Sequence, residues 1–378
     1  MKPWALGFIV LVADVLEIIA DGESVYQNSS TLEEPEPIRL LYGESHGIAW
    51  TDVTTRKRQR NILTKRYLDV DSIDYHYKRN LFYYTGWGAI WRLPMEDAGP
   101  EAQGEEIVRF DYGVGTLAVD WEHDHIYWTS PSTGFVWRLG LDENEGNSVV
   151  VVENAGNLTR HNNVAVDPYM RYLFVATESG HSLRTDLDGD NRMRLNHGLR
   201  LTSLALDLQN RRVYTCGSKA FAPVLQSSDY WGENMVDYEI QHGSDWWIRL
   251  IGLDVFSTGP DQPPQLFWVH QGWSDKDTAW RVNTTNGHLS WEQEYVASGT
   301  VLDPETRIWC VKVYHSDVQR RPEYLDFEED PVPSSSEAMA IANWTVIKSD
   351  GSSYILTSQS WFEFLYLGIA VAILLRPM

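Results

Sequence analysis

The sequence predicts an all-β protein, a six-bladed β-propeller flanked by an apolar segment at each end. Three observations predict this fold. A short aromatic motif recurs six times, each copy follows an aspartate that closes an apolar triplet or its remnant, and helical spacing of apolar residues is nearly absent. Strand-rich repeats of about 40–50 residues are typical of propeller blades. The second residues of the six motifs are Tyr83, Tyr127, Phe174, Tyr214, Phe267 and Trp309.

The second repeat shows what each blade needs. Leu117–Asp120 reads as a strand buried on both faces, Glu122–His125 as a polar turn and Ile126–Thr129 as the next strand. The aspartate is expected to accept hydrogen bonds from backbone N–H groups of the turn. The aromatic side chains are expected to fill the wedge between neighbouring blades. The aspartates given this structural role are Asp74, Asp120, Asp167, Asp207, Asp254 and Asp303.

These motifs resemble the LDL-receptor class B repeat, the "YWTD" propeller of lipoprotein receptors, Wnt co-receptors and nidogen. Tyr127-Trp128-Thr129 with Leu117–Asp120 matches the family motif, and Thr185–Arg192 matches its third-strand ending. The resemblance covers about two thirds of the chain. The final aspartate of the motif is replaced in every copy, by Gly86, Ser130, Thr177, Gly217, His270 and Lys312. The rival WD repeat expects Gly-His and Trp-Asp pairs at fixed offsets within each repeat, and that pattern is absent.

The ring needs a closing segment, and the sequence offers two. Residues 38–70 contain two further strands, and residues 339–358 contain another pair around Trp344. We expect one of these segments to complete the last blade of a propeller that spans residues 38–358. An acidic, Pro/Ser-rich insertion is expected at residues 315–337.

Both ends of the chain suggest export and a membrane anchor. Residues 1–20 have the layout of a signal peptide, with an uncleaved anchor as the alternative because Asp14 and Glu17 interrupt it. Residues 361–375 are apolar except Glu363 and are followed by Arg376, which fits either a GPI-attachment signal or a short transmembrane helix. Both place the propeller outside the cell. The glycosylation sequons are Asn28, Asn157, Asn283 and Asn343.

The amino-acid composition limits the classes of partner that the protein is expected to bind. The net charge of −22 repels nucleic acid and anionic headgroups and favours basic partners, although solubility alone also explains it. The only cysteines, Cys216 and Cys310, fall two blades apart, so we expect two buried free thiols. Relatives in the family carry cysteine-rich EGF-like modules, which two cysteines cannot build.

One face of a propeller gathers the loops before the first strand and after the second strand of each blade, and the resemblance implies ligand binding there. Exposed aromatic residues beside polar groups are typical of binding hot spots, although these tryptophans can equally pack between blades. The candidate ligand-binding residues are Trp87, Trp246, Trp247, His270, Trp273 and Asp275.

Catalytic and metal motifs are weak. His123-x-His125 lies in a polar turn without a third ligand, and Asp186-x-Asp188-x-Asp190 lacks the distal glutamate of a calcium loop. We therefore expect no enzyme activity, metal or cofactor. The predicted function is an extracellular, membrane-anchored, receptor-like module that binds a secreted or cell-surface protein. The alternatives are a metal-dependent hydrolase of the six-bladed type and a structural adhesion or matrix protein.

Overall fold

The computed structural model describes thirteen stretches of the chain: residues 36–53, 61–65, 69–141, 148–158, 163–220, 222–238, 249–259, 263–271, 277–285, 288–298, 308–326, 344–349 and 353–358. These residues form strands and three short 3-10 helices. The all-β prediction is therefore confirmed. The chain divides into two compact units, Met1–Arg320 and Arg321–Met378.

The described part of the first unit contains six four-stranded antiparallel sheets. Sheet 1 consists of β4 (Ser72–His76), β5 (Leu81–Gly86), β6 (Ala89–Pro94) and β7 (Glu105–Arg109), with the 3-10 turn η1 (Met95–Asp97) after β6. Sheet 2 consists of β8 (Leu117–Asp120), β9 (His125–Ser130), β10 (Phe135–Gly140) and β11 (Val149–Val152). Sheet 3 consists of β12 (Val164–Asp167), β13 (Tyr172–Ala176), β14 (His181–Asp186) and β15 (Met193–Asn196).

The remaining three sheets follow the same strand order. Sheet 4 consists of β16 (Arg200–Asp207), β17 (Arg212–Lys219), β18 (Ala222–Asp229) and β19 (Val236–Tyr238). Sheet 5 consists of β20 (Arg249–Phe256), β21 (Gln265–Gln271), β22 (Asp277–Thr285) and β23 (His288–Ser298). Sheet 6 joins the two ends of the unit, because β24 (Ile308–Tyr314) pairs with β1 (Arg39–Glu44), followed by β2 (Gly47–Asp52) and β3 (Asn61–Lys65).

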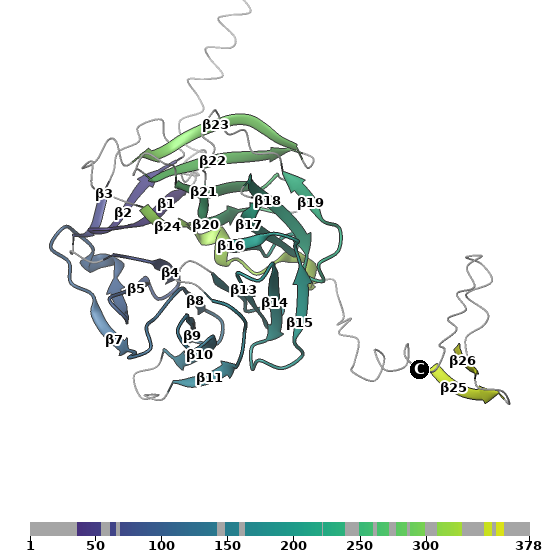
Figure 1. The fold of residues 1–378 in the computed structure, drawn as a ribbon. Helices are drawn as coiled ribbons and strands as arrows, with labels where there is room; N and C mark the ends of the chain where they lie inside the picture. Colours follow the sequence, from purple (N-terminus) through teal and green to yellow (C-terminus); the bar gives the residue numbers. More distant parts are fainter. Residues whose placement is uncertain are drawn as a thin grey trace, which may run out of the picture. The chain divides into compact units, whose positions relative to one another are not determined.

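The sheets are arranged around a central axis, as in a β-propeller (Figure 1). The first strands β4, β8, β12, β16 and β20 each contact the first strand of the next sheet, β20 contacts β24, and β24 contacts β4. The propeller prediction is therefore confirmed.

Sheet 6 corrects the predicted register of the last repeat. Residues 308–311 were expected to be a second strand, but β24 occupies the inner, first-strand position and pairs with β1. The second-strand place is taken by β1, so Leu40-Leu41-Tyr42 replaces the sixth aromatic motif. Of the two candidate closing segments, residues 38–65 close the sheet. Asp303 lies outside the described residues.

Apolar side chains hold the sheets together. Buried residues of the described part form six clusters, one at each junction between consecutive sheets. Successive strand residues point to opposite faces, so Tyr127 packs against sheet 3 while Trp128 packs against sheet 1. Both are fully buried. The aromatic motif therefore fills two junctions at once.

The second unit is described separately. It contains the 3-10 turn η3 (Glu323–Asp326) and a two-stranded sheet of β25 (Trp344–Ser349) and β26 (Ser353–Ser358), which pair with each other. The predicted terminal segments, residues 1–20 and 361–375, and residues 327–337 of the predicted acidic insertion lie outside the described residues, whereas residues 315–326 of that insertion are described and contain η3 and the 3-10 turn at Ser316–Gln319. None of the helices in the described ranges has the length and hydrophobicity of a membrane-spanning segment.

Candidate functional site

The sheets expose two different faces. We call the face with the turns between first and second strands, and between third and fourth strands, the turn face. The opposite face carries the turns between second and third strands and the connections from each fourth strand to the next sheet. We call it the loop face, and it is the face on which the sequence predicted ligand binding.

Trp87 is the best-defined candidate on the loop face. It forms the two-residue turn between β5 and β6 with Gly88, since Gly86 pairs with Ala89. Both turn residues have positive φ, 54° for Trp87 and 72° for Gly88, as in a type I′ hairpin that usually takes Asn-Gly or Gly-Gly. A side chain in this left-handed conformation costs about 1–2 kcal/mol. The tryptophan is nevertheless 59% exposed, which makes it a candidate contact rather than a packing residue.

A second exposed aromatic residue lies in the next connection of the loop face. Tyr112 is 61% exposed and follows β7. The two segments are joined, because the Phe110 N–H donates to the Gly88 carbonyl at 3.0 Å and Arg109 donates to the carbonyl of Trp87 at 3.3 Å. The Phe110 ring packs on Tyr112 with centroids 5.7 Å apart. The loop face of sheets 1 and 2 therefore offers an aromatic patch, Trp87 and Tyr112, on a hydrogen-bonded base.

A groove of about 620 Å³ lies on the loop face between sheets 3 and 4. Its lining residues are mostly small and polar, with an ion pair at one side between Glu178 and Arg200. Gly180 and Gly198 expose backbone along it, and Lys219 is exposed at its edge. Sequence reasoning did not find this groove because its residues come from three separate turns.

The other predicted ligand residues are not placed. Trp246, Trp247, Trp273 and Asp275 lie outside the described residues. His270 belongs to β21, where its backbone pairs with Thr278, but its side chain is outside the described part. Trp87 is the one candidate of this set that the structure brings to a surface.

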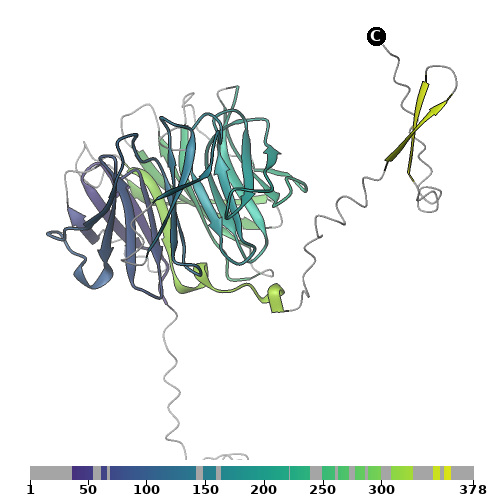
Figure 2. The same cartoon turned by 90° about the horizontal axis from the view of Figure 1, so that it is seen from below.

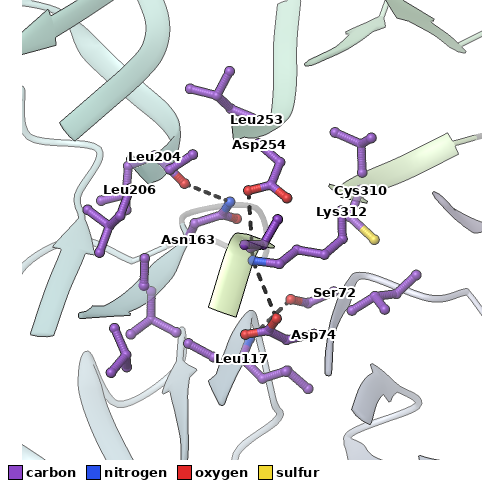
Figure 3. Close-up of a pocket in the computed structure, with 18 of the residues that line it drawn as sticks. Ser72, Asp74, Leu117, Asn163, Leu204, Leu206, Leu253, Asp254, Cys310 and Lys312 are labelled. Atoms are coloured by element: carbon purple, nitrogen blue, oxygen red, sulfur yellow. Dashed lines mark hydrogen bonds and ion pairs between the residues drawn. The ribbon is translucent and has the colours of Figure 1, made fainter. Parts of the chain in front are cut away.

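A small cavity lies on the axis, among the first strands. Its volume is about 70 Å³, enough for a few water molecules. Asp74, Lys312 and Asp254 line one side (Figure 3). Ala118, Ala165 and Ala205, from the three remaining sheets, line the other. These six residues occupy equivalent positions, each paired with the middle of a second strand. Of these six equivalent positions, three neighbours are therefore charged and three are alanine, and Asn163 adds a polar side chain to the lining.

Lys312 provides the positive charge of this cavity. Its Nζ lies 3.3 Å from Asp74 Oδ1 and 3.8 Å from Asp254 Oδ1. Burial alone would lower the pKa of Lys312, but the carboxylates of Asp254 and Asp74 outweigh burial and raise it. Burial raises the pKa of Asp254, an effect opposed by Lys312 and by the N–H of Val313. The lysine therefore acts as the internal counter-ion of two buried carboxylates.

The repeat aspartates have two roles. Asp120 accepts from the turn N–H groups of Glu122 and His123, at 3.3 and 3.1 Å. Asp167 and Asp207 accept in the same way from the N–H groups of their own turns. These three contacts are of the predicted kind.

Asp74 and Asp254 need a correction. Their carboxylates accept from the next sheet instead, Asp74 from the Val119 N–H at 2.9 Å and Asp254 from the Val313 N–H at 2.7 Å. Pairing explains the difference. Asp120 pairs with the residue before its motif, whereas Asp74 pairs with Tyr83, the second residue of the motif. Asp74 therefore points to the axis, two positions before the turn.

Hydroxyl groups add further links between the first strands. Ser72 Oγ accepts from the Leu117 N–H at 3.1 Å, and Thr116 Oγ1 accepts from the Val164 N–H at 3.1 Å. Ser203 Oγ accepts from the Leu253 N–H at 3.0 Å. Since neighbouring first strands do not pair as a sheet, these side chains supply the hydrogen bonds between them.

The segment after β24 crosses the axis at the turn face (Figure 2). This closing segment, residues 315–320, contains η2 (Ser316–Gln319). The Gln319 amide donates to the Tyr75 carbonyl at 2.6 Å and accepts from the Tyr77 N–H at 2.9 Å. Gln319 and Val318 also line the axial cavity.

The far side of the closing segment is held by sheets 3 and 4. Tyr169 donates to the carbonyl of Gln319 at 2.8 Å, and Gln209 donates to the carbonyl of Arg320 at 3.1 Å. The segment therefore closes the axial cavity at the turn face and ties three sheets together.

The residues of the two weak metal motifs, His123-x-His125 and Asp186-x-Asp188-x-Asp190, make contacts within the fold. His123 Nδ1 lies 2.9 Å from the carboxylate of Asp120, and its Nε2 accepts from Arg171. The described residues contain no group of three or more His, Cys, Asp or Glu placed to hold a metal ion. Asp186 accepts from the N–H of Asp190 at 2.8 Å, which makes the Asp-x-Asp-x-Asp segment a turn of its own sheet.

Both cysteines are free thiols, as expected, but only Cys216 is fully buried, whereas Cys310 as a residue is partly buried. The desolvated surroundings of its thiol raise the pKa of Cys310 to about 12. Among the sequons, Asn157 is exposed on the loop face, Asn283 belongs to β22 without a described side chain, and Asn28 and Asn343 lie outside the described residues.

Comparison with known proteins supports the fold. No protein-family model matches the chain. The crystal structure of a nidogen/laminin complex contains a similar chain, with a TM-score of 0.59, 12% identity and coverage of 74% of this chain and 99% of that one. TolB from Acinetobacter baumannii has a TM-score of 0.51 and 10% identity, over 72% of this chain and 66% of that one. A putative TolB from Agrobacterium tumefaciens has a TM-score of 0.51 and 10% identity, over 74% of this chain and 98% of that one. At these identities the likeness shows a β-propeller fold, similar to the YWTD type, and no more.

Proposed function

We propose that this chain is an extracellular, membrane-anchored binding module, a six-bladed propeller of YWTD type that presents its loop face to a secreted or cell-surface protein. The observation that carries the proposal is the aromatic patch of Trp87 and Tyr112. Large aromatic residues held exposed on a rigid base are typical binding hot spots. The six sheets of the described part and the six junction clusters support the blade count.

The two described ends of the first unit both lie away from the loop face. Glu36, the first described residue, accepts hydrogen bonds from the hydroxyl groups of Ser316 and Tyr77, at 2.6 and 2.7 Å. The first unit ends at Arg320, whose carbonyl is bonded to Gln209. Both residues therefore lie at the turn face, on the side opposite Trp87 and Tyr112.

The acidic chain favours a basic partner. A net charge of −22 attracts basic proteins over a distance of about 8 Å at physiological salt. Such steering raises the association rate and weakens with added salt.

The charges in the axial cavity argue against the alternative function, a metal-dependent hydrolase. A metal-dependent hydrolase would need carboxylates free to bind the ion, but Asp74 and Asp254 already share the Lys312 ammonium. Fitting a divalent cation there would bring like charges together. We therefore favour binding without catalysis.

The experiment is a binding screen on intact cells. The full chain is expressed with an epitope tag, its surface exposure is measured by antibody staining of unpermeabilised cells, and purified extracellular proteins are added over a range of salt. For any saturable partner, Trp87→Ala should weaken binding about tenfold. The matched control is Trp231→Ala, because Trp231 is 43% exposed on the turn face and should leave the affinity unchanged. Chains that stay in the cytosol, or equal losses in both variants, would contradict the proposal.

A further inference from the structure

We propose that Arg184 and Trp231 form a second binding site, on the turn face between sheets 3 and 4, which takes an aspartate or glutamate side chain of a partner protein. The site goes beyond the proposed function, because it lies on the face opposite Trp87 and binds an acidic group. It therefore serves a different partner, and Trp231→Ala remains a control for a partner that binds the loop face.

Three third strands carry an arginine at the same position, opposite the second residue of the aromatic motif. These are Arg92, Arg138 and Arg184, which pair with Tyr83, Tyr127 and Phe174. The guanidinium of Arg92 donates to the carboxylate of Glu105 at 2.6 Å, and that of Arg138 donates to Asp188 of the next sheet at 2.8 Å. Arg184 forms no ion pair with any described residue. Within the described part of the chain, it is therefore the member of this set that lacks a carboxylate.

A change in one turn explains the missing carboxylate. Residues 186–191 of sheet 3 and 229–234 of sheet 4 form the same turn. The first aspartate of each accepts from the N–H four residues later and from the asparagine side chain five residues later, at 2.8 to 2.9 Å. The third residue of the turn is Asp188 in sheet 3, where its carboxylate meets Arg138, and Trp231 in sheet 4. Tryptophan therefore stands in sheet 4 where the carboxylate would be.

The guanidinium of Arg184 is fixed in place with one side left open. Its Nη1 donates to the carbonyl of Tyr230 at 2.9 Å. Its Cζ lies 4.6 Å from the ring centroid of Tyr172 and 5.7 Å from that of Trp231. Nε is buried without an acceptor, whereas Nη2 is not buried and bonds to no described residue. Nη2 can therefore donate to a carboxylate that approaches from solvent.

The surface beside Arg184 suits a peptide side chain. Trp231 is 43% exposed, and Met235, at the end of the same turn, is 42% exposed. These side chains would pack against the stem of a bound aspartate or glutamate and against an apolar neighbour of it. A polyanion is disfavoured because the chain carries a net charge of −22. The pair of Asp188 and Arg138, with 2.8 Å between Oδ1 and Nη1, shows the contact that we expect.

The test is a selection from a library of short random peptides displayed on phage. The immobilised full chain is the target, and the library is first depleted on the Trp231→Asp variant. This variant restores the residue type that the same turn carries in sheet 3. It should therefore keep the fold and occupy Arg184 with an internal carboxylate. Binding of an amidated synthetic copy of each enriched peptide is then measured by calorimetry.

The enriched peptides should contain an aspartate or glutamate beside an apolar residue. Arg184→Gln, Trp231→Asp and replacement of the peptide's acid by its amide should each weaken binding about tenfold or more, since each takes away a charge-assisted hydrogen bond. Lys78→Ala is the matched control. It removes a cation of the turn face outside the site, with a side chain 73% exposed, and should leave the affinity unchanged.

Several results would overturn the proposal. They are enriched peptides without an acidic residue, binding that Arg184→Gln and Trp231→Asp leave unchanged, and the absence of any enrichment over Trp231→Asp. Self-association of the full chain that Trp231→Asp abolishes would also overturn it, because the occupant would then be a second copy. A failed search for a loop-face partner leaves this site untouched, so the two proposals fail separately.

Discussion

At the scale of single residues, Asp120 shows how one carboxylate holds a turn. It is fully buried, and its oxygens accept from two turn N–H groups and face the ring of His123. Asp120→Ala should leave these donors unpaired and lower the free energy of unfolding by about 2 kcal/mol. Urea denaturation measures the change. Asp188→Ala is the control, because Asp188 is 61% exposed beside Arg138 and should change stability by under about 0.5 kcal/mol. Equal effects of the two substitutions would contradict the role of Asp120.

His197 makes stability depend on pH. It is buried, and its Nε2 lies 2.8 Å from Ser182 Oγ. Burial lowers the pKa of His197 to about 4, with a smaller contribution from His181. Between the ordinary value of 6.5 and about 4 the unfolded chain binds a proton that the folded protein excludes, so stability must fall as pH falls through this window.

The size of this effect is testable. The lowered pKa of His197 corresponds to a change in the free energy of unfolding of about 3 kcal/mol at most. His197→Gln should flatten the dependence of the unfolding free energy on pH between pH 6.5 and 4.5, measured by urea titrations at several pH values. An unchanged slope would show that other groups carry the pH dependence.

The residue scale also shows where prediction from sequence stops. The sequence identified the aspartates that precede the aromatic motifs, and for Asp120, Asp167 and Asp207 the observed contacts are of the expected kind. It could not separate Asp74 from them, because a shift of two positions keeps a residue on the same face of a strand. That shift moves the carboxylate from the turn to the axis, and only the pairing of β4 with β5 reveals it.

At the scale of elements, the position of β24 depends on a charge as well as on strand pairing. Lys312 of β24 links Asp254 of β20 and Asp74 of β4, which are the first strands of the two neighbouring sheets. Lys312→Met should lower the free energy of unfolding by about 3 kcal/mol at neutral pH, since it leaves two buried carboxylates without a cation.

The pH dependence distinguishes this role from packing. Burial raises the pKa of Asp254, and Lys312 opposes this effect. Without the lysine, the folded protein should therefore hold a proton on Asp254 more tightly than the unfolded chain does, and the loss of stability should shrink as the pH falls and this carboxylate becomes neutral. Denaturation of the wild type and Lys312→Met at pH 7 and pH 5 measures this change. Adding Asp254→Asn to Lys312→Met should recover part of the loss. A loss that is the same at both pH values would mean that the methylene chain, not the charge, matters.

Prediction at the element scale succeeded where a repeat is complete and failed where it is split. The first five motifs each place a first and a second strand in sequence. In sheet 6 the inner strand comes from residues 308–314 and its partners from residues 39–65. A repeat divided between the chain ends carries no continuous pattern, so Trp309 was read as part of a second strand. The axial cavity was missed for a related reason, because its lining residues come mostly from the first strands of all six sheets and are therefore far apart in sequence.

At the scale of the whole molecule, the propeller depends on the meeting of its two ends. The β1–β24 pairing, the contacts of Glu36 with Ser316 and the closing segment all join residues far apart in sequence. Removing β24 would leave β1 as an unpaired edge and open two of the six junction clusters, which contain Ile308, Val311 and Tyr314.

Two truncations test this dependence. A chain that ends at Arg320 keeps every junction and should melt within a few degrees of the full chain. A chain that ends before Ile308 should lose cooperative unfolding, because sheet 6 then lacks its inner strand and two neighbouring sheets face solvent with apolar side chains. Calorimetry of both proteins measures the difference. A sharp transition in the shorter chain would mean that the remaining sheets fold without closure, and the assignment of β24 and Lys312 as the closing elements would have to be abandoned.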